Sequence, residues 1–163
     1  AAAAGRAVSL TAADGVQLRA FLVPAAGAAG VDGAQPRFIA VLVHGLFRGA
    51  LEIETPGRML REIGGETLLL ELRNHGGSGR ARPTFGRDES LDVLAAVSFL
   101  RARPEAQGRP LILFGVSLGT AAAAIAAAPA PVFNSLRLVG SIGVLLVPAL
   151  FRRVRSWPGI LRK

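Results

Sequence analysis

Leu-Ile-Leu-Phe-Gly-Val-Ser-Leu-Gly, residues 111–119, is the most informative stretch of this chain. Residues 111–116 are all apolar or glycine, which is typical of a strand buried on both faces. The alanine-rich residues 118–128 favour a helix, and Pro129 and Pro131 end it. Ser117 therefore falls where a buried strand turns directly into a helix.

Two glycines flank this serine, Gly115 two residues before it and Gly119 two residues after it. In a sharp strand-to-helix turn a serine takes a strained backbone conformation that exposes its hydroxyl, and side chains at the flanking positions would clash. The context therefore predicts that Ser117 is a nucleophile. The alternative interpretation is that the glycines serve only close packing and that Ser117 is a helix N-cap.

The rest of the chain alternates between strand and helix patterns. Short strands are expected at 8–11 and 16–23, joined by a tight turn at Asp14-Gly15. Further strands are expected at 38–43, 67–72 and 111–116, and helices at 51–63, 90–101 and 118–128. This order predicts an α/β fold with a mostly parallel sheet, an N-terminal antiparallel hairpin and helices on both faces. Residues 132–163 are expected to form a sixth strand or the start of a cap, followed by a basic tail.

Length and composition limit the class of protein. The 163 residues, 51% hydrophobic and 18% charged, fit one globular domain, residues 1–163. Cysteine is absent, which excludes disulfides, thiolate metal sites and cysteine nucleophiles. Most of the net charge of +8 comes from residues 106–163, which contain no Asp, Glu or His.

Targeting and partner signals are weak. The longest apolar run, residues 138–151, is shorter than the roughly 20 residues of a spanning helix, and no signal peptide is visible, so a cytoplasmic protein is expected. The chain starts without Met and looks trimmed. Contact of the basic tail with an anionic membrane surface is an alternative to an ordinary cap helix with a basic face. Nucleic-acid binding is not expected, because aromatic residues are only 6% of the chain.

Two more polar segments follow expected strands. His44-Gly45 comes directly after residues 38–43, and the N–H of Leu46 is expected to join that of Leu118 in an oxyanion hole. A structural role is the favoured interpretation for His44 itself. The glycine-rich residues 71–79 could hold a phosphate, but they lack the Gly-Lys-Ser/Thr ending of a P-loop.

These motifs, in this order, resemble the α/β-hydrolase superfamily, especially bacterial esterase-like serine hydrolases, over residues 10–128. The family pattern runs from an Asp-Gly hairpin to His-Gly, then Asp-x-Arg-Gly-His-Gly-x-Ser, then Gly-x-Ser-x-Gly. Glu71 and Asn74 depart from the third of these motifs, where Asp and Gly are usual. Thr84-Phe85-Gly86, followed by two acidic residues, is also similar to the family.

The resemblance implies an α/β-hydrolase fold and a role for each motif. Ser117 would be the nucleophile, and the N–H groups of Leu46 and Leu118 would form the oxyanion hole. The structural residues of the motifs would be His44, Gly45, Arg73, His75, Gly115 and Gly119. The implied activity is hydrolysis of carboxylic esters or related acyl compounds, with a small-molecule ester as substrate, an acyl-Ser117 intermediate, and no cofactor or metal.

One departure from the family concerns the catalytic triad of serine, acid and histidine. The family places its acid and its histidine base after the nucleophile, and residues 118–163 supply neither. We therefore expect an incomplete chain whose C-terminal strands are missing, since a sheet that ends here leaves an open edge. A rewired triad would have to use His44 or His75. The acidic residues near the helix at 90–101 are interpreted as helix-start charges: Asp88, Glu89 and Asp92.

The alternative function is a catalytically inactive hydrolase-like domain that binds a partner. The sequence predicts no oligomeric state.

Overall fold

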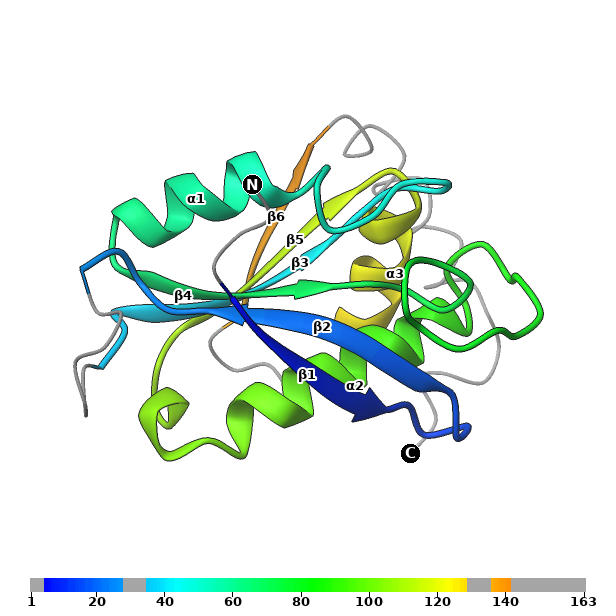
Figure 1. Ribbon diagram of the computed structural model, residues 1–163, viewed down its shortest axis with the longest axis horizontal. Helices are drawn as coiled ribbons and strands as arrows, with labels where there is room; N and C mark the ends of the chain where they lie inside the picture. The colour runs from blue at the N-terminus through cyan, green and yellow to red at the C-terminus, as the bar shows by residue number, and fades with distance from the viewer. Residues whose placement is uncertain (1–4, 28–34, 129–135, 142–163) are drawn as a thin grey trace.

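The computed structural model describes residues 5–27, 35–128 and 136–141. In these ranges the chain forms a six-stranded sheet with flanking helices (Figure 1). The strands are β1 (Arg6–Thr11), β2 (Gln17–Val23), β3 (Phe38–Val43), β4 (Gly65–Leu70), β5 (Leu111–Val116) and β6 (Leu136–Ser141). The helices are α1 (Glu54–Glu62), α2 (Glu89–Arg101), the short 3-10 helix η1 (Pro104–Ala106) and α3 (Leu118–Ala127).

The sheet has the order β1-β2-β4-β3-β5-β6. β1 and β2 form the expected antiparallel hairpin, and Gly15 in its turn has a φ of 87°, which a glycine adopts without strain. β2 is also antiparallel to β4, whereas β3 is parallel to both β4 and β5, and β5 is parallel to β6. The predicted mostly parallel sheet with antiparallel N-terminal strands is therefore confirmed.

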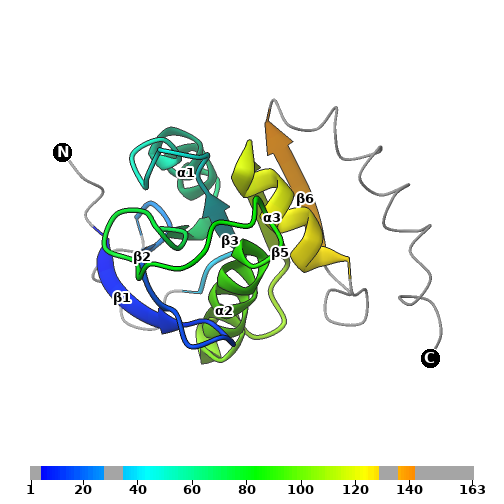
Figure 2. The ribbon, with the colours of Figure 1, turned by 90° about the vertical axis from the view of Figure 1, so that its right-hand side faces the viewer.

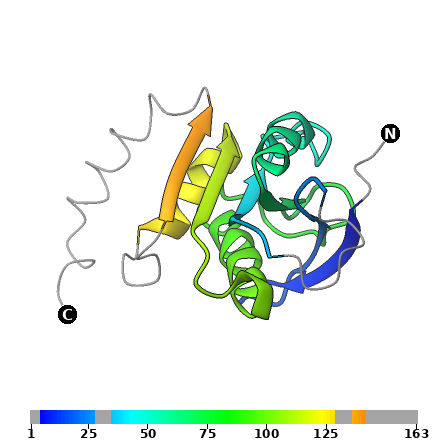
Figure 3. The same cartoon turned by 90° about the vertical axis from the view of Figure 1, so that its left-hand side faces the viewer.

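Helices cover both faces of the sheet, as Figures 2 and 3 show. α2 and α3 pack on one face, over a core that includes Val41 and Leu113. α1 lies over the opposite face, where Leu42 and Leu69 form a smaller core with Ile53. Alternate residues of β3 enter the two cores, which explains why that strand is apolar throughout.

Several predicted boundaries differ from the structure by one or two residues, and the largest differences are at α1 and β4. α1 begins at Glu54 rather than at residue 51, and Pro56 lies in its first turn, where a missing N–H costs no helix hydrogen bond. β4 runs from Gly65 to Leu70 rather than from 67 to 72, because the Leu72 N–H donates to the ring of His44 instead of to a neighbouring strand. At the start of β4, a Cβ on Gly65 would lie 2.3 Å from the Phe38 ring, so the position of this ring requires a glycine there.

The C-terminal part of the chain is described only at β6, which pairs with β5 along its whole length. The expectation for residues 132–163 otherwise lies outside the described residues. No helix in the described ranges has the length and apolarity that a bilayer crossing requires.

Candidate active site

The turn between β5 and α3 has the strained geometry that its sequence predicts. Ser117 has φ 49° and ψ −111°, a conformation that residues other than glycine rarely adopt. Its side chain is exposed and makes no capping hydrogen bond to the helix that follows. Ser117 is therefore at the N-cap position without acting as a side-chain cap. Its hydroxyl also has no hydrogen-bond partner elsewhere among the described residues.

Both flanking glycines are sterically required. A Cβ on Gly115 would lie 2.5 Å from the backbone of Gly119 and Thr120. A Cβ on Gly119 would lie 2.3 Å from the Val43 carbonyl oxygen at the end of β3. Because these neighbours are backbone atoms, neither site can accommodate a side chain. The hydroxyl of Thr120 donates to the Gly115 carbonyl at 2.7 Å and ties the start of α3 back to β5.

The loop after β3 lies against this turn. β3 and β5 are parallel neighbours, and Val43 pairs with Gly115, so both loops begin at the carboxyl ends of adjacent strands. A Cβ on Gly45 would lie 3.5 Å from the Ser117 Cβ. The structure thus brings His44-Gly45 and Ser117 together, as the sequence predicts.

The three N–H groups that follow His44 in the chain differ in their hydrogen bonding. The Gly45 N–H donates to Glu52 Oε2 at 2.6 Å, and the Phe47 N–H donates to His75 Nε2 at 3.1 Å. The Leu46 N–H between them has no acceptor within the part of the chain that the structure describes. The same is true of the Leu118 N–H, which is the first of α3 and has no intrahelical partner. Two unused backbone donors therefore belong to the two loops that meet at Ser117.

Both nitrogens of the His44 ring are occupied by backbone groups. Nε2 accepts the Leu72 N–H at 3.1 Å, so the proton is assigned to Nδ1, which donates to the Gly45 carbonyl at 2.7 Å. Complete burial lowers the pKa of His44 and keeps the ring neutral. This geometry fits a structural role.

His75 is bound in a similar way. Its Nδ1 lies 2.9 Å from the Arg73 carbonyl, and its Nε2 accepts the Phe47 N–H. The rings of His44 and His75 meet edge to face with centroids 4.7 Å apart. Since the ring nitrogens of both histidines are held by backbone groups, neither is presented to Ser117 as a base.

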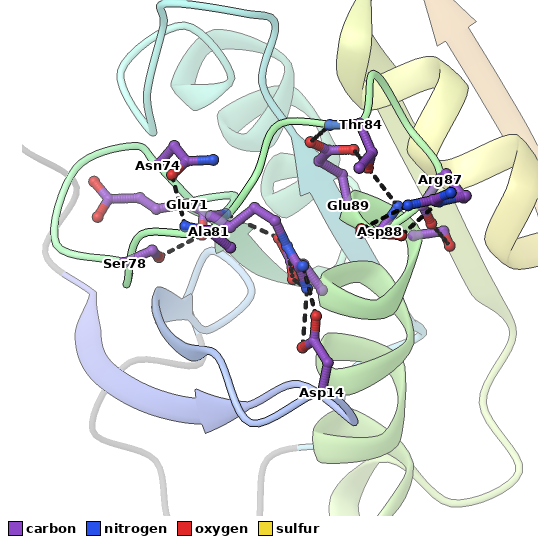
Figure 4. Close-up of polar contacts among 12 residues, drawn as sticks. Asp14, Glu71, Asn74, Ser78, Ala81, Thr84, Arg87, Asp88 and Glu89 are labelled. Carbon is purple, nitrogen blue, oxygen red and sulfur yellow. Dashed lines mark hydrogen bonds and ion pairs between the residues drawn. The ribbon is translucent and has the colours of Figure 1, made fainter.

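Arg73 is the centre of a buried ion network. Only 1% exposed, it donates to both carboxylate oxygens of Asp92 in α2 and to Asp14 in the β1–β2 turn, with a shortest distance of 2.6 Å to each carboxylate. Figure 4 labels Asp14 at this ion pair. Burial raises the pKa of Asp92 despite these bonds, because desolvation opposes the charged form. Asp92 was interpreted from the sequence as a helix-start charge. It lies in the first turn of α2, but its carboxylate is completely buried against Arg73.

The glycine-rich loop at residues 74–79 binds the carboxylate of Glu71. Glu71 accepts the Gly77 N–H at 2.8 Å and pairs with Arg19 at 2.7 Å. Burial acts to raise the pKa of Glu71, but the hydrogen bonds from Arg19 and the Gly77 N–H, together with the charge of Arg19, outweigh it, and the pKa is lowered. The place that a phosphate would take is thus filled by an internal carboxylate.

Glu89 shapes the next loop. Its carboxylate accepts hydrogen bonds from the N–H and hydroxyl of Thr84 and from the N–H of Gly86 (Figure 4). Burial acts to raise the pKa of Glu89, but these bonds lower it. Asp88, in contrast, pairs with Arg87 at the surface. Of the three acids, only Asp88 remains a solvent-facing helix-start charge.

Residues 40–162 match the Alpha/beta hydrolase family, over well more than half of the chain. The chain belongs to the alpha/beta hydrolase family. A search of curated proteins found no match.

Solved structures of alpha/beta hydrolase fold proteins are similar to this chain. An esterase from Pyrococcus furiosus is 22% identical with a TM-score of 0.63, over 74% of this chain and 44% of its own. A serine hydrolase without a lid from Xanthomonas campestris is 23% identical with a TM-score of 0.67, over 83% and 60%. The bottromycin epimerase BotH is 26% identical with a TM-score of 0.60, over 82% and 47%. The chain thus spans only about half of the length of the structures that it matches.

The residues that the sequence singled out lie at one edge of the sheet, in the loops after β3, β4 and β5. Among the described residues, no group of three or more His, Cys, Asp or Glu side chains could hold a metal ion.

Sequence reasoning missed two contributions to this site. Glu52 lies four residues after Arg48, whose Nε is 3.6 Å from one carboxylate oxygen, and its other oxygen accepts the Gly45 N–H. The link from His75 to Phe47 joins two loops that are 28 residues apart. The sequence gives no signal for this role, because the predicted helix at 51–63 contains Glu52, whereas α1 begins at Glu54.

Proposed function

We propose that this chain carries the nucleophile and the oxyanion hole of a serine hydrolase that acts on carboxylic esters or related acyl compounds. The observation that carries the proposal is Ser117 at the end of β5, an exposed serine in a strained conformation whose hydroxyl has no hydrogen-bond partner in the described part of the chain. Strain of this kind persists only where the surrounding structure enforces it, and it concentrates at reactive sites.

In the proposed reaction, Ser117 Oγ attacks the carbonyl carbon of the ester. The carbonyl oxygen becomes an oxyanion, which accepts hydrogen bonds from the Leu46 and Leu118 N–H groups. The bond to the alcohol oxygen breaks, the alcohol leaves with a proton, and the acyl group stays on Ser117. Water then attacks the acyl-serine, which releases the carboxylic acid and restores the hydroxyl.

The proton of Ser117 needs an acceptor that residues 118–163 do not supply, because they contain no Asp, Glu or His. His44 and His75 are bound to the backbone and are not proposed as the base. In other serine hydrolases, the oxyanion hole and substrate binding alone give a rate about 10³–10⁴ above that in water. A weak reaction that an added base strengthens is therefore expected of residues 1–163 alone.

Similar proteins support the proposal only in part. An esterase and a serine hydrolase share the fold, but so does an epimerase, so the fold does not determine the reaction. The proposal depends on the local geometry at Ser117. The substrate proposed is a small acyl ester, and no cofactor is invoked.

The test uses the chain with imidazole as an external base and a 4-nitrophenyl ester as substrate. We expect release of 4-nitrophenol to exceed that of imidazole alone, with an acyl group on Ser117 detected by mass spectrometry. Ser117→Ala should abolish the excess, whereas Ser78→Ala should leave most of it. Equal rates for the chain and Ser117→Ala would reject the proposal.

A second candidate function is a non-catalytic, partner-binding domain, favoured by the absence of an acid and a base after Ser117. It predicts no reaction at Ser117 with or without imidazole, together with association of the chain with itself or another protein. The imidazole experiment separates the two candidates.

A further inference from the structure

The hydrogen bonds around residues 45–48 involve two side chains that lie outside the strained turn. We propose that Glu52 and His75 are positioning residues, which hold this loop from both sides. Of the three N–H groups of Gly45, Leu46 and Phe47, only that of Leu46 then stays available to an oxyanion, beside the Leu118 N–H. This inference rests on the proposed function, because the position of the Leu46 N–H affects a rate only if Ser117 reacts.

Glu52 holds the first half of the loop. It lies in the turn before α1, and its Oε2 accepts the Gly45 N–H at 2.6 Å, a charge-assisted bond. A Cβ on Gly45 would lie 3.2 Å from this oxygen and 3.5 Å from the Ser117 Cβ. The carboxylate, the glycine and the strained turn thus meet at one point. Arg48 Nε lies 3.6 Å from the other carboxylate oxygen, and the Glu52 side chain is only 26% exposed.

His75 holds the second half from the loop after β4. Its Nδ1 is bound to the Arg73 carbonyl, which leaves Nε2 as the acceptor for the Phe47 N–H. Phe47 has φ 58°, which is unusual for a bulky residue and needs support from its surroundings. Its side chain is 89% exposed, so packing supplies little of that support. The hydrogen bond to His75 therefore supports this residue, in addition to the turn bond from the Arg48 N–H to the Gly45 carbonyl at 3.3 Å.

The two bonds fix the peptide groups on either side of Leu46. Among the described residues, the Gly45 and Phe47 N–H groups are bound to side chains, and the Leu46 N–H between them has no acceptor. A donor that is held in place before the reaction stabilises an oxyanion without reorganisation, and loss of one such donor costs about 10²–10³ in rate. Removing either restraint should therefore reduce the stabilisation of the transition state more than it reduces the binding of the ester.

The kinetic test uses the full chain with imidazole and a 4-nitrophenyl ester, and it separates the maximal acylation rate from the ester concentration at half saturation. We expect Glu52→Ala and His75→Ala to lower the maximal rate by about tenfold or more, with little change in half saturation. Glu52→Gln should stay close to the parent, because its amide oxygen can still accept the Gly45 N–H. Glu62→Ala is the matched control, since Glu62 is exposed and pairs only loosely with Arg58 at 3.9 Å.

Amide hydrogen exchange provides a readout that does not depend on activity. In the parent chain, the Gly45 and Phe47 amides should exchange more slowly than that of Leu46. Glu52→Ala should speed exchange of the Gly45 amide, and His75→Ala should speed exchange of the Phe47 amide. The amides of β3 should keep their protection, which shows that the fold is intact.

Each outcome bears on the proposal. Variants that lose amide protection and acylate about tenfold more slowly support it. Variants that lose protection but react like the parent overturn it, as does a Leu46 amide that is as protected as its neighbours. If the parent reacts no faster than Ser117→Ala, the proposed function fails first, and the positioning role fails with it.

Discussion

Two loops at the same edge of the sheet are rich in glycine and contain one serine each, yet they differ in what their polar groups do. In the loop after β4, Ser78 accepts the Arg19 N–H and donates to the Glu71 carbonyl, and Glu71 accepts the Gly77 N–H. In the turn after β5, the Ser117 hydroxyl has no partner among the described residues. The first loop is satisfied internally and serves as scaffold, whereas in the second the Leu118 N–H and the Ser117 hydroxyl have no partner among the described residues.

The largest effect should come from breaking the scaffold. Arg73→Leu leaves the buried carboxylate of Asp92 without its partner, and loss of one member of a buried pair costs about 3–5 kcal/mol. We expect this loss in the free energy of unfolding, measured by urea denaturation. Arg87→Leu is the matched control, because Arg87 pairs with Asp88 at the surface. Equal effects of the two substitutions would mean that the Arg73 network does not hold the loops.

A smaller effect is expected from filling the space at the strained turn. Gly119→Ala puts a Cβ against the Val43 carbonyl, and overpacking of this kind costs about 1–3 kcal/mol. The same substitution at Gly49, where nothing lies within 4 Å, should be close to neutral. Thermal unfolding of both variants measures the difference. A tolerated Gly119→Ala with full reactivity of Ser117 would contradict the steric account of the turn.

Relief of strain should stabilise the protein while it removes the hydroxyl. Ser117→Gly makes the positive φ permissible and releases strain of about 1–3 kcal/mol. This gain exceeds the entropic cost of ordering a more flexible glycine on folding, about 0.5–1 kcal/mol. Ser117→Ala loses the same hydroxyl without this relief. We expect the glycine variant to be the more stable of the two by about 1 kcal/mol in chemical denaturation. The opposite order would show that the turn is not strained.

The smallest effect concerns pH and the scaffold loop. The pKa of Glu71 is lower in the folded state, so the stability from its pair with Arg19 is present above the ordinary pKa of a glutamate and is lost as the pH falls through the folded value. Because Arg19 is 46% exposed, Arg19→Met should cost less than about 1 kcal/mol at neutral pH. The difference in melting temperature from the parent should shrink as the pH falls below the ordinary pKa of a glutamate and through the lower folded value. A difference that is constant with pH would exclude the ion pair as its cause.

The sequence predicted those features that depend on neighbours in the chain or on the periodicity of strands. Apolar runs located β3 and β5 at their observed bounds, and the Asp14-Gly15 turn located the hairpin. The spacing of Gly115 and Gly119 indicated the strained turn, because the clash that excludes side chains is set by a sharp strand-to-helix turn.

The interactions that the sequence did not predict join segments far apart in the chain. The bonds from Arg73 to Asp14 and Asp92 span 59 and 19 residues, and no periodic pattern encodes them. The role of Glu52 depends on how the loop after β3 folds back, which a pair at i and i+4 with Arg48 conceals.

The central claim is that Ser117 differs from Ser78 in reactivity, and labelling with a fluorophosphonate tests it most directly. In this reaction the serine oxygen bonds to phosphorus and fluoride leaves. We predict one adduct per chain, located on Ser117 by peptide mass spectrometry, faster with added imidazole and absent in Ser117→Ala. No adduct on Ser117, or equal labelling of Ser78 and Ser117, would contradict the account.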